Sequence, residues 1–538
     1  MYADLVFRNG SVHTLDAEGT VAEAVAVQGG RIVAVGRNAD VEPLTGPATE
    51  IVELAGRALL PGFQDAHVHP LFAGLTMIRC DLHEATSAEE AVAAIAAYAA
   101  AHPEVEWISG GGWSMEWFPG GTPGRALLDS VVDDRPVYLV NSDGHGAWVN
   151  SVALKLAGVD ADTPDPADGR IEREPDGSPQ GTLHEGAAGL VGRHQPEPTP
   201  EMRLEGLLAG QRELHSVGVT AWQDAMVDEQ VQATYQRAAE SGLLTGRVVG
   251  SLWWDRDRGV EQIPELVERR VAGGLFRTTT VKIMQDGVAE NFTAAMTAPY
   301  LDGCGCGTSN SGISFIDPEV LREAVTRLDA LGFQVHVHAV GDRAAREALD
   351  AFATAREVNG AGDNRHHIAH LQVVHPDDVP RFADLGVTAN MQPLWAAHEP
   401  QMDELTIPVL GDGLASWQYP FGDLSRSGAH LAAGSDWPVS SANPFWGIHV
   451  AVNRVAPGVD LPVFLPEQRL DLGTALAAYT RGTAWTNHLD ASTGTIEEGK
   501  YADLVVTDRD PYAIAADELG ETKVLATYVN GVLVFDGA

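Results

Sequence analysis

Short apolar runs alternate with longer amphipathic stretches through the middle of the chain. One such stretch predicts a helix, because Asp317 can cap its start, Pro318 suits the first turn and Gly332 follows its end. Strands that alternate with helices indicate a parallel sheet, and eight such units predict an α/β fold of the (β/α)8 TIM-type barrel class. The eight predicted strands lie in ALLPGFQDAHVH (58–69), GVTAWQDA (218–225), GRVVGSLWW (246–254), TTVKIMQDG (279–287), FQVHVHAVGD (333–342), HHIAHLQ (366–372), VTANMQP (387–393) and HLAAGSDWP (430–438).

The two ends of the chain carry a different pattern, in which short alternating strands are joined by glycine-containing turns. Asn530-Gly531 between two apolar runs predicts a β-hairpin. We therefore expect residues 1–57 and 490–538 to form one small β-sandwich domain. Residues 58–489 would form the barrel, with an insertion at about 85–200 that shapes the substrate pocket.

The composition, 44% hydrophobic and 20% charged among 538 residues, is that of a folded globular protein. The formal net charge of −40 disfavours binding to nucleic acid or to anionic membranes, and no apolar run is long enough to span a bilayer. The N-terminal sequence MYADLVFRNGSV lacks the features of a signal peptide, so we expect a cytoplasmic protein. The three cysteines are too few for a disulfide framework, and we interpret Cys304-Gly-Cys306 as an ordinary loop.

Polar residues gather where the predicted strands end, on the side of a barrel that carries its chemistry. His67 and His69 stand two positions apart in the first strand, so their side chains share one face. A His-x-His pair alone can arise by chance, but other strand ends add groups that suit zinc and similar ions. These are Lys282 in the fourth strand, His336 and His338 in the fifth, His370 in the sixth and Asp436 in the eighth.

The sequence around these residues resembles the amidohydrolase superfamily. The matching motifs are PGFQDAHVHP, VKIMQDGVAENFTAAMTAPY, VHAVGDRA, IAHLQVVHPDD and GSDWPVSSANPF. The resemblance covers nearly the whole chain and is strongest to the third family, which includes a deformylase of N-substituted formamides. It implies a metal-dependent hydrolase of a carbon–nitrogen bond other than a peptide bond. One departure is Ser114, where relatives often carry an acidic residue.

This resemblance also implies a centre with one or two divalent ions, zinc or a similar metal. Carboxylated Lys282 would bridge two ions. We expect His336, His366 and His367 to have structural roles instead. The implied ligands are His67, His69 and Asp436 for the buried ion, and His338 and His370 for the more exposed one.

Ordinary roles remain as alternatives for three of the site residues. Lys282 could pair with Asp286, and Asp436 could cap a helix after the eighth strand. His145 could be a loop histidine that binds backbone. In the catalytic interpretation, hydroxide formed from metal-bound water attacks a carbonyl. Asp436 then accepts the proton and returns it to the leaving amine, while His145 donates to the developing oxyanion.

Aromatic residues in the insertion and after the last strands favour a small amide with an apolar or aromatic substituent. The family resemblance implies that this amide is N-substituted and formamide-like. Trp113, Trp395 and His145 are the candidate substrate-binding residues, although aromatic residues more often belong to a core. A lactone, carbamate or ester hydrolase remains open. A cyclic deaminase commonly uses one metal and no bridging lysine, and a non-enzymatic scaffold would be expected to have lost ligands. We expect a small-molecule partner, and a homo-oligomer such as a dimer is compatible with the sequence.

Overall fold

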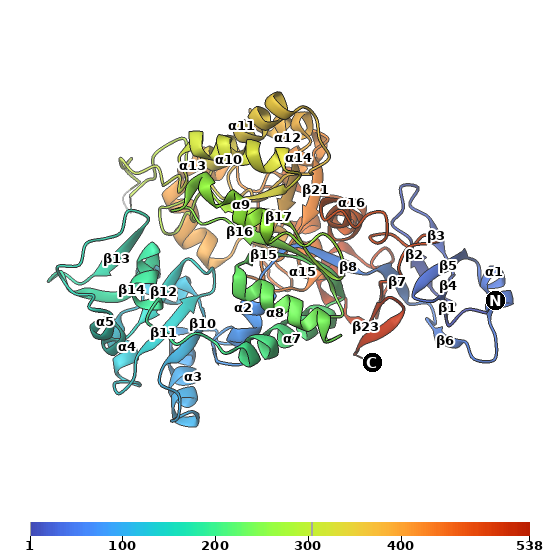
Figure 1. The fold of residues 1–538 in the computed structure, drawn as a ribbon, viewed down its shortest axis with the longest axis horizontal. Helices are drawn as coiled ribbons and strands as arrows, with labels where there is room; N and C mark the ends of the chain where they lie inside the picture. The colour runs from blue at the N-terminus through green and yellow to red at the C-terminus, as the bar shows by residue number, and fades with distance from the viewer. Residues whose placement is uncertain (1, 303–304, 538) are drawn as a thin grey trace.

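An eight-stranded parallel sheet forms the centre of the molecule in the computed structural model, which describes residues 2–302 and 305–537 (Figure 1). Its strands pair in chain order and are β8 (Phe63–Val68), β15 (Val219–Val227), β16 (Arg247–Trp253), β17 (Phe276–Met284), β18 (Gln334–Ala339), β19 (His367–His370), β20 (Thr388–Met391) and β21 (His430–Ala433). The sheet closes where the chain after β21 meets β8. The Asp436 N–H donates to the His67 carbonyl at 2.8 Å, and the His69 N–H donates to the Trp437 carbonyl at 2.9 Å. The predicted barrel is confirmed.

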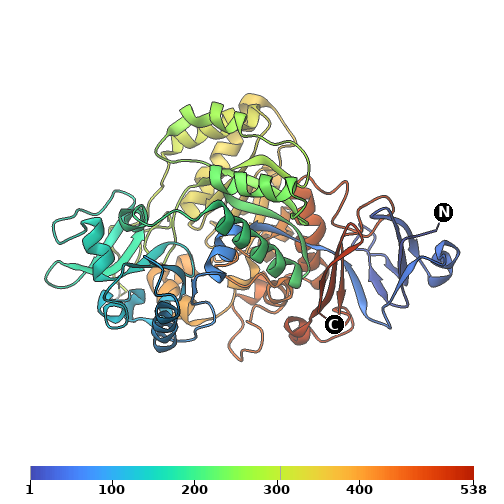
Figure 2. The ribbon, with the colours of Figure 1, turned by 60° about the horizontal axis from the view of Figure 1, so that its bottom comes forward.

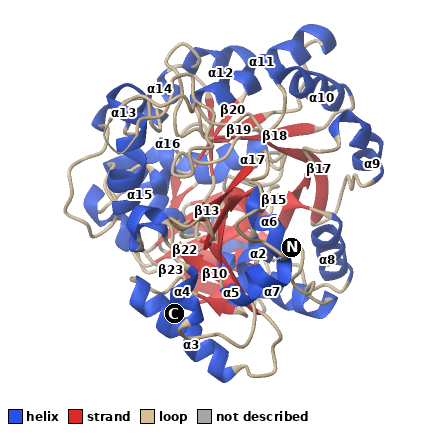
Figure 3. Ribbon diagram, turned by 90° about the vertical axis from the view of Figure 1, so that its left-hand side faces the viewer, coloured by secondary structure: helices blue, strands red, loops and turns tan. Residues whose placement is uncertain are grey.

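Helices surround the barrel sheet (Figure 3). α10 (Pro318–Ala330) begins as predicted, because the Asp317 side chain accepts a hydrogen bond from the Glu319 N–H. Gly332 follows this helix at φ +72°, a conformation that favours glycine. The other helices of the barrel are α2 (Pro70–Met77), α7 (Pro200–Ser216), α8 (Glu229–Glu240), α9 (Ile263–Glu268), α11 (Asp342–Asn359), α12 (Val379–Leu385), α13 (Ile407–Ala415), α14 (Phe421–Arg426), α15 (Pro444–Asn453), α16 (Leu472–Ala477) and α17 (Thr483–Thr486).

The first predicted strand, 58–69, is two strands in the structure. β7 (Ala58–Pro61) pairs with β2 (Ser11–His13) and belongs to the terminal sheets, whereas β8 starts the barrel. The chain crosses between them at Gly62, where a Cβ atom would lie 2.3 Å from the Thr220 hydroxyl oxygen. The expectation of one strand is wrong because both segments are apolar and buried, so the residue pattern does not mark the crossing.

The two chain ends together form a four-stranded and a six-stranded sheet that pack on one apolar core (Figure 1). Asn530 and Gly531 have φ of +53° and +71° in a two-residue turn, so the predicted hairpin is confirmed. The Arg247 guanidinium links the barrel to these sheets by donating to the Asp503 carboxylate at 2.8 Å. The remaining strands are β1 (Leu5–Arg8), β3 (Val21–Ala22), β4 (Ala24–Gln28), β5 (Arg31–Gly36), β6 (Glu50–Glu53), β22 (Leu504–Thr507), β23 (Val524–Val529) and β24 (Val532–Asp536), and the first sheet is flanked by α1 (Asn38–Val41).

The insertion lies at the end of the molecule opposite to the terminal sheets (Figure 2) and has a six-stranded mixed sheet of its own. Sequence analysis did not predict this sheet, because a strand such as ISGGGW has low β-propensity. Its glycines allow close approach, since a Cβ atom on Gly110 would lie 1.9 Å from the Cys80 carbonyl oxygen. The elements are β9 (Cys80–Asp81), α3 (Ala88–Ala101), β10 (Ile108–Trp113), α4 (Arg125–Asp129), β11 (Val137–Asn141), β12 (Gly146–Val149), α5 (Ser151–Ala157), β13 (Gly169–Arg173), β14 (Pro179–Glu185) and α6 (Gly189–Gly192).

Two further observations concern the cysteines and membrane spans. Cys80 is buried and Cys306 is exposed, and both are free thiols. Cys304, the other cysteine of the predicted loop, lies outside the described residues. Within the described ranges, no helix has the length and apolar character needed to cross a bilayer.

Candidate metal centre and active site

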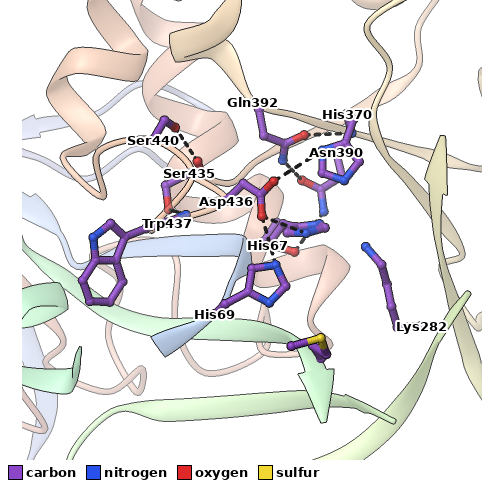
Figure 4. A network of polar contacts seen from close by, with 12 residues as sticks. His67, His69, Lys282, His370, Asn390, Gln392, Ser435, Asp436, Trp437 and Ser440 are labelled. Atoms are coloured by element: carbon purple, nitrogen blue, oxygen red, sulfur yellow. Dashed lines mark hydrogen bonds and ion pairs between the residues drawn. The ribbon is translucent and has the colours of Figure 1, made fainter. Parts of the chain in front are cut away.

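His67, His69 and Asp436 converge at the carboxyl end of the barrel (Figure 4). The Asp436 Oδ1 atom lies 3.2 Å from His67 Nε2 and 3.0 Å from His69 Nε2. One potential ligand atom from each residue lies within 4.8 Å of the others. The geometry arises where the first and last strands meet, and Asp436 adopts φ +57°, an uncommon conformation for a non-glycine residue.

Asp65 holds this junction together. Its carboxylate accepts hydrogen bonds from the His67 N–H at 2.9 Å and from the Ser435 hydroxyl at 2.6 Å. The Ser435 N–H also donates to it, at 3.1 Å. Burial raises the pKa of Asp65 to about 7, although these donors favour the ionised form. Asp65 therefore positions two ligand-bearing segments rather than lining the metal cluster itself.

His338, His370 and Lys282 lie beside the first three side chains. The Nδ1 atom of His370 is 3.8 Å from Asp436 Oδ2, and the His338 and His370 ring centroids are 4.3 Å apart. Figure 4 shows the Lys282 amine directed toward the cluster. Its Nζ atom is 3.4 Å from His336 Nε2. His336 Nε2 also lies 2.9 Å from His67 Nδ1, so His336 contacts two candidate ligands, Lys282 and His67.

The ordinary alternatives for Lys282 and Asp436 do not match the structure. Asp286 accepts from the His338 ring at 3.0 Å and from backbone N–H groups, including that of Gly341 at 2.8 Å, rather than from Lys282. The helix after β21 is capped by Asn443, whose side chain accepts from the Phe445 N–H at 3.0 Å. Asp436 is therefore not the cap of that helix.

The charge state of the cluster suits a divalent cation. Burial lowers the pKa of His67 to about 3 and the pKa of His370 well below its usual value, so these imidazoles are neutral and keep a lone pair. Burial raises the pKa of Asp436, but His67 and His69 outweigh it and hold that pKa well below its usual range. Both ring nitrogens of His370 are buried and make no hydrogen bond within the described chain. Unpaired buried nitrogens beside a carboxylate fit a metal ligand set.

Lys282 differs from an ordinary surface lysine. It is 3% exposed, and burial lowers its pKa to about 7, with only Asp436 favouring the charged form. In a large fraction of the molecules, the Lys282 side chain is therefore a neutral amine near neutral pH. A neutral amine is the form that can add to carbon dioxide, because it has a free lone pair.

His145 reaches the cluster from the insertion. Its Nδ1 atom lies 3.0 Å from Glu185 Oε2, which contradicts the alternative of a histidine bonded to backbone. Burial lowers the pKa of His145, but the Glu185 carboxylate outweighs it and raises the pKa to about 9. Glu185 itself accepts from the Thr293 hydroxyl at 2.7 Å and has φ +51°. Glu185 was not predicted from the sequence, because its partner His145 lies forty residues earlier, in the loop before β12.

Two cavities meet at His145, His338, His370 and Asp436. The larger, with a volume of about 460 Å³, has apolar walls that include Phe72, Met226, Trp253 and Met284. We call it the apolar cavity. The smaller, about 230 Å³, contains Trp395 and several carboxylates, and we call it the acidic cavity.

The two tryptophans predicted to bind substrate, Trp395 and Trp113, have different surroundings in the structure. The Trp395 ring stacks on His370, with centroids 5.4 Å apart and planes 4° from parallel. Trp113 is 1% exposed and lies in the core of the insertion, where its indole N–H donates to the Leu139 carbonyl at 2.8 Å. The expectation that Trp113 contacts substrate is therefore corrected, since packing of the insertion sheet accounts for it.

The remaining histidines have structural surroundings. His366 contacts Asp329 at 3.0 Å away from the cluster. His367 is buried, with its ring centroid 4.0 Å from that of His336. Ser114 lines the acidic cavity and donates to the Glu116 carboxylate, so an acidic residue does stand in this loop, two positions later.

Comparison with known proteins agrees with this geometry. The family model described as "Amidohydrolase family" matches residues 50–535. The chain belongs to the amidohydrolase family. This amidohydrolase is 32% identical to Protein LONG AFTER FAR-RED 3 of Arabidopsis thaliana, over 98% of this chain and 91% of that protein. It is 29% identical to the N-substituted formamide deformylase of Arthrobacter pascens, over 99% and 98%. A crystal structure of an uncharacterized metal-dependent hydrolase from Pyrococcus furiosus superposes with a TM-score of 0.72 at 26% identity, covering 94% of this chain and 99% of that one.

Proposed function

We propose that this amidohydrolase cleaves the carbon–nitrogen bond of a small N-substituted amide whose nitrogen substituent is apolar or aromatic. The observation that carries the proposal is the apolar cavity, which opens directly onto His69 and Asp436. The similarity to a deformylase of N-substituted formamides supports the same bond type. Phe72, Trp253 and Met284 would contact the substituent, because apolar walls favour burial of an apolar group.

The ligand set supports a zinc-like divalent ion held by His67, His69 and Asp436, with a second held by His338 and His370. Lys282 would join the two after its amine adds to carbon dioxide, forming an N–C bond and releasing one proton. A metal bound here would polarise a carbonyl and make water more acidic. Residues that approach on strands of a closed barrel keep their relative positions, which favours an ordered site.

Asp436 and His145 have separate roles in this proposal. Asp436 is a carboxylate at neutral pH, so it can accept the proton of the attacking water and pass it to the leaving amine nitrogen. His145 is a cation held by Glu185, and its Nε2–H would donate to the oxygen on which negative charge develops. Trp395 fixes the His370 ring by stacking.

A substrate panel tests the proposal. The metal content of protein purified without chelators should be measured first, and N-benzylformamide, N-benzylacetamide, a γ-lactone and an alkyl carbamate should then be compared. We expect release of benzylamine from the amides. Hydrolysis of the lactone or carbamate, with both amides unchanged, would reject the amide assignment and favour the other hydrolase class.

Two further predictions concern the surroundings of the enzyme. We propose a small-molecule partner and no nucleic acid, because the net charge of −40 repels polyanions. A cytoplasmic location and a homodimer remain predictions, and sedimentation of the purified protein would test the second.

A further inference from the structure

The glutamates of the acidic cavity have no role in the amide chemistry described so far. Its three glutamates come from separate parts of the chain: Glu116 from the insertion, Glu290 from the loop after β17, and Glu399 from the loop after β20. Asp143 and Asp436 also line it. The cavity adjoins the candidate metal ligands and shares six lining residues with the apolar cavity, namely Asp143, His145, His338, His370, Asp436 and Val439. A substrate bound across the cluster would place one end in each cavity.

The His145 cation compensates the negative charge of this cavity only in part. Across the described ranges, no lysine or arginine lines it, and Glu399 forms no ion pair. Glu290 accepts a hydrogen bond from the neutral Thr406 hydroxyl. Desolvation of its carboxylate, with Glu116 and Glu290 nearby, raises the pKa of Glu399 to about 7, although the residue as a whole is exposed. Glu116 and Glu290 are half-buried and Glu399 is exposed, so a ligand can reach all three. A cation bound among them would offset the repulsion between the like charges.

A second observation points to a ligand independently of the carboxylates. Tyr419 is 2% exposed and lines the cavity, and its hydroxyl has no hydrogen-bond partner among the described residues. Burial, together with the Glu290 and Glu399 charges, raises the pKa of Tyr419 well above its usual value, so the hydroxyl keeps its proton and can donate it in a hydrogen bond. Gln372 is 6% exposed, and its amide nitrogen donates to Gln418, which leaves its carbonyl oxygen free to accept.

The arrangement of the glutamates fits an organic cation better than a metal ion. In the described chain, the three-residue groups close enough to hold a metal comprise only His67, His69 and Asp436. The glutamates of the acidic cavity therefore surround a wider space, and a volume of about 230 Å³ accepts a short aminoalkyl group. Trp395 adds an aromatic face, which attracts ammonium and guanidinium groups.

We propose that the acidic cavity binds a protonated amine on the acyl arm of the substrate, so that the substrate carries a cation on one side of the scissile bond and an apolar group on the other. The position of the scissile bond rests on the proposed function. The proposed cation site does not depend on the proposed function.

Kinetics with a matched substrate pair test this inference. N-benzyl-5-aminopentanamide and N-benzylhexanamide differ only in the replacement of a terminal methyl group by an ammonium group. We expect kcat/KM about 10- to 100-fold higher for the amine, the range for a hydrogen bond to a charged group. Glu399→Gln and Glu290→Gln should each remove most of this preference, mainly through KM, and leave the neutral amide unchanged. Equal kcat/KM for both substrates in the wild-type enzyme would overturn the inference while the proposed function stands.

Calorimetry keeps the inference testable if no amide is hydrolysed. The metal-loaded enzyme should bind n-pentylamine more tightly than 1-pentanol, and Glu399→Gln and Tyr419→Phe should weaken only the amine. Glu404→Gln is the matched control, because it removes an exposed carboxylate from the same segment outside the cavity. Equal binding of amine and alcohol, or amine binding that survives both Glu290→Gln and Glu399→Gln, would overturn the inference. Loss of amide turnover alone would reject only the proposed function.

Discussion

Glu185→Gln isolates the contribution of one carboxylate to the candidate active site. Glutamine keeps the shape of the side chain and can still accept from the Thr293 hydroxyl, but it cannot hold His145 as a cation. The side chains of His145 and Glu185 are 12% and 4% exposed, so solvent screens the pair weakly. Without the carboxylate, burial dominates, and we expect the pKa of His145 to fall from about 9 to below its usual value of 6.5.

The size of the effect follows from the pKa difference. A rise from 6.5 to about 9 corresponds to about 3 kcal/mol of preference for the cation in the folded state. Because the folded pKa is raised, this stabilisation is fully present below pH 6.5 and is lost as the pH rises through about 9. The free energy of unfolding of the wild type should therefore fall by about 3 kcal/mol over that window, relative to Glu185→Gln.

Two assays measure this effect. NMR titration of the His145 ring in metal-free protein gives the pKa directly, and denaturant unfolding at pH 6.5 and 9 gives the change in stability. Turnover of a verified amide at pH 7.5 should fall by up to about 10²-fold, because one oxyanion donor loses its charge. Glu172→Gln is the control, since Glu172 pairs with His184 at 3.1 Å, a pair that lines neither cavity. The reasoning is refuted if His145 titrates at the same pH in the wild type and in Glu185→Gln.

Two substitutions and one crystallographic experiment test the metal centre. Asp436→Asn keeps an oxygen ligand but cannot accept a proton, so metal content should persist while kcat falls by ~10²–10⁴-fold; near-normal turnover would show that another group moves the proton. His67→Ala should lose the buried ion and all activity, measured by metal analysis, and full metal content in that variant would contradict the ligand assignment. Electron density at Lys282 in a crystal grown with bicarbonate should extend beyond Nζ; an unmodified amine beside a single well-occupied ion would favour a mononuclear site and the deaminase alternative.

The barrel strands and the metal-ligand candidates could be predicted from the sequence for the same physical reason. A parallel strand buried on both faces is a continuous apolar run, and polar residues at its end stand out against that background. The prediction that His67, His69 and Asp436 lie together required only the rule that strand ends meet at one rim of a barrel. The cap at Asp317 and the Asn530-Gly531 turn are equally local, since each depends on two or three neighbouring residues.

Interactions between distant segments were decided by the tertiary structure alone. The pairing of His145 with Glu185, the crossing at Gly62 and the burial of Trp113 depend on how the insertion and terminal sheets pack against the barrel. Strand periodicity determines which face a residue occupies but not what stands opposite it. The sequence by itself therefore determined the barrel and its candidate metal ligands. Only the packing of three separate segments brought Glu116, Glu290 and Glu399 around one cavity, because the sequence does not show which residues will surround a given carboxylate.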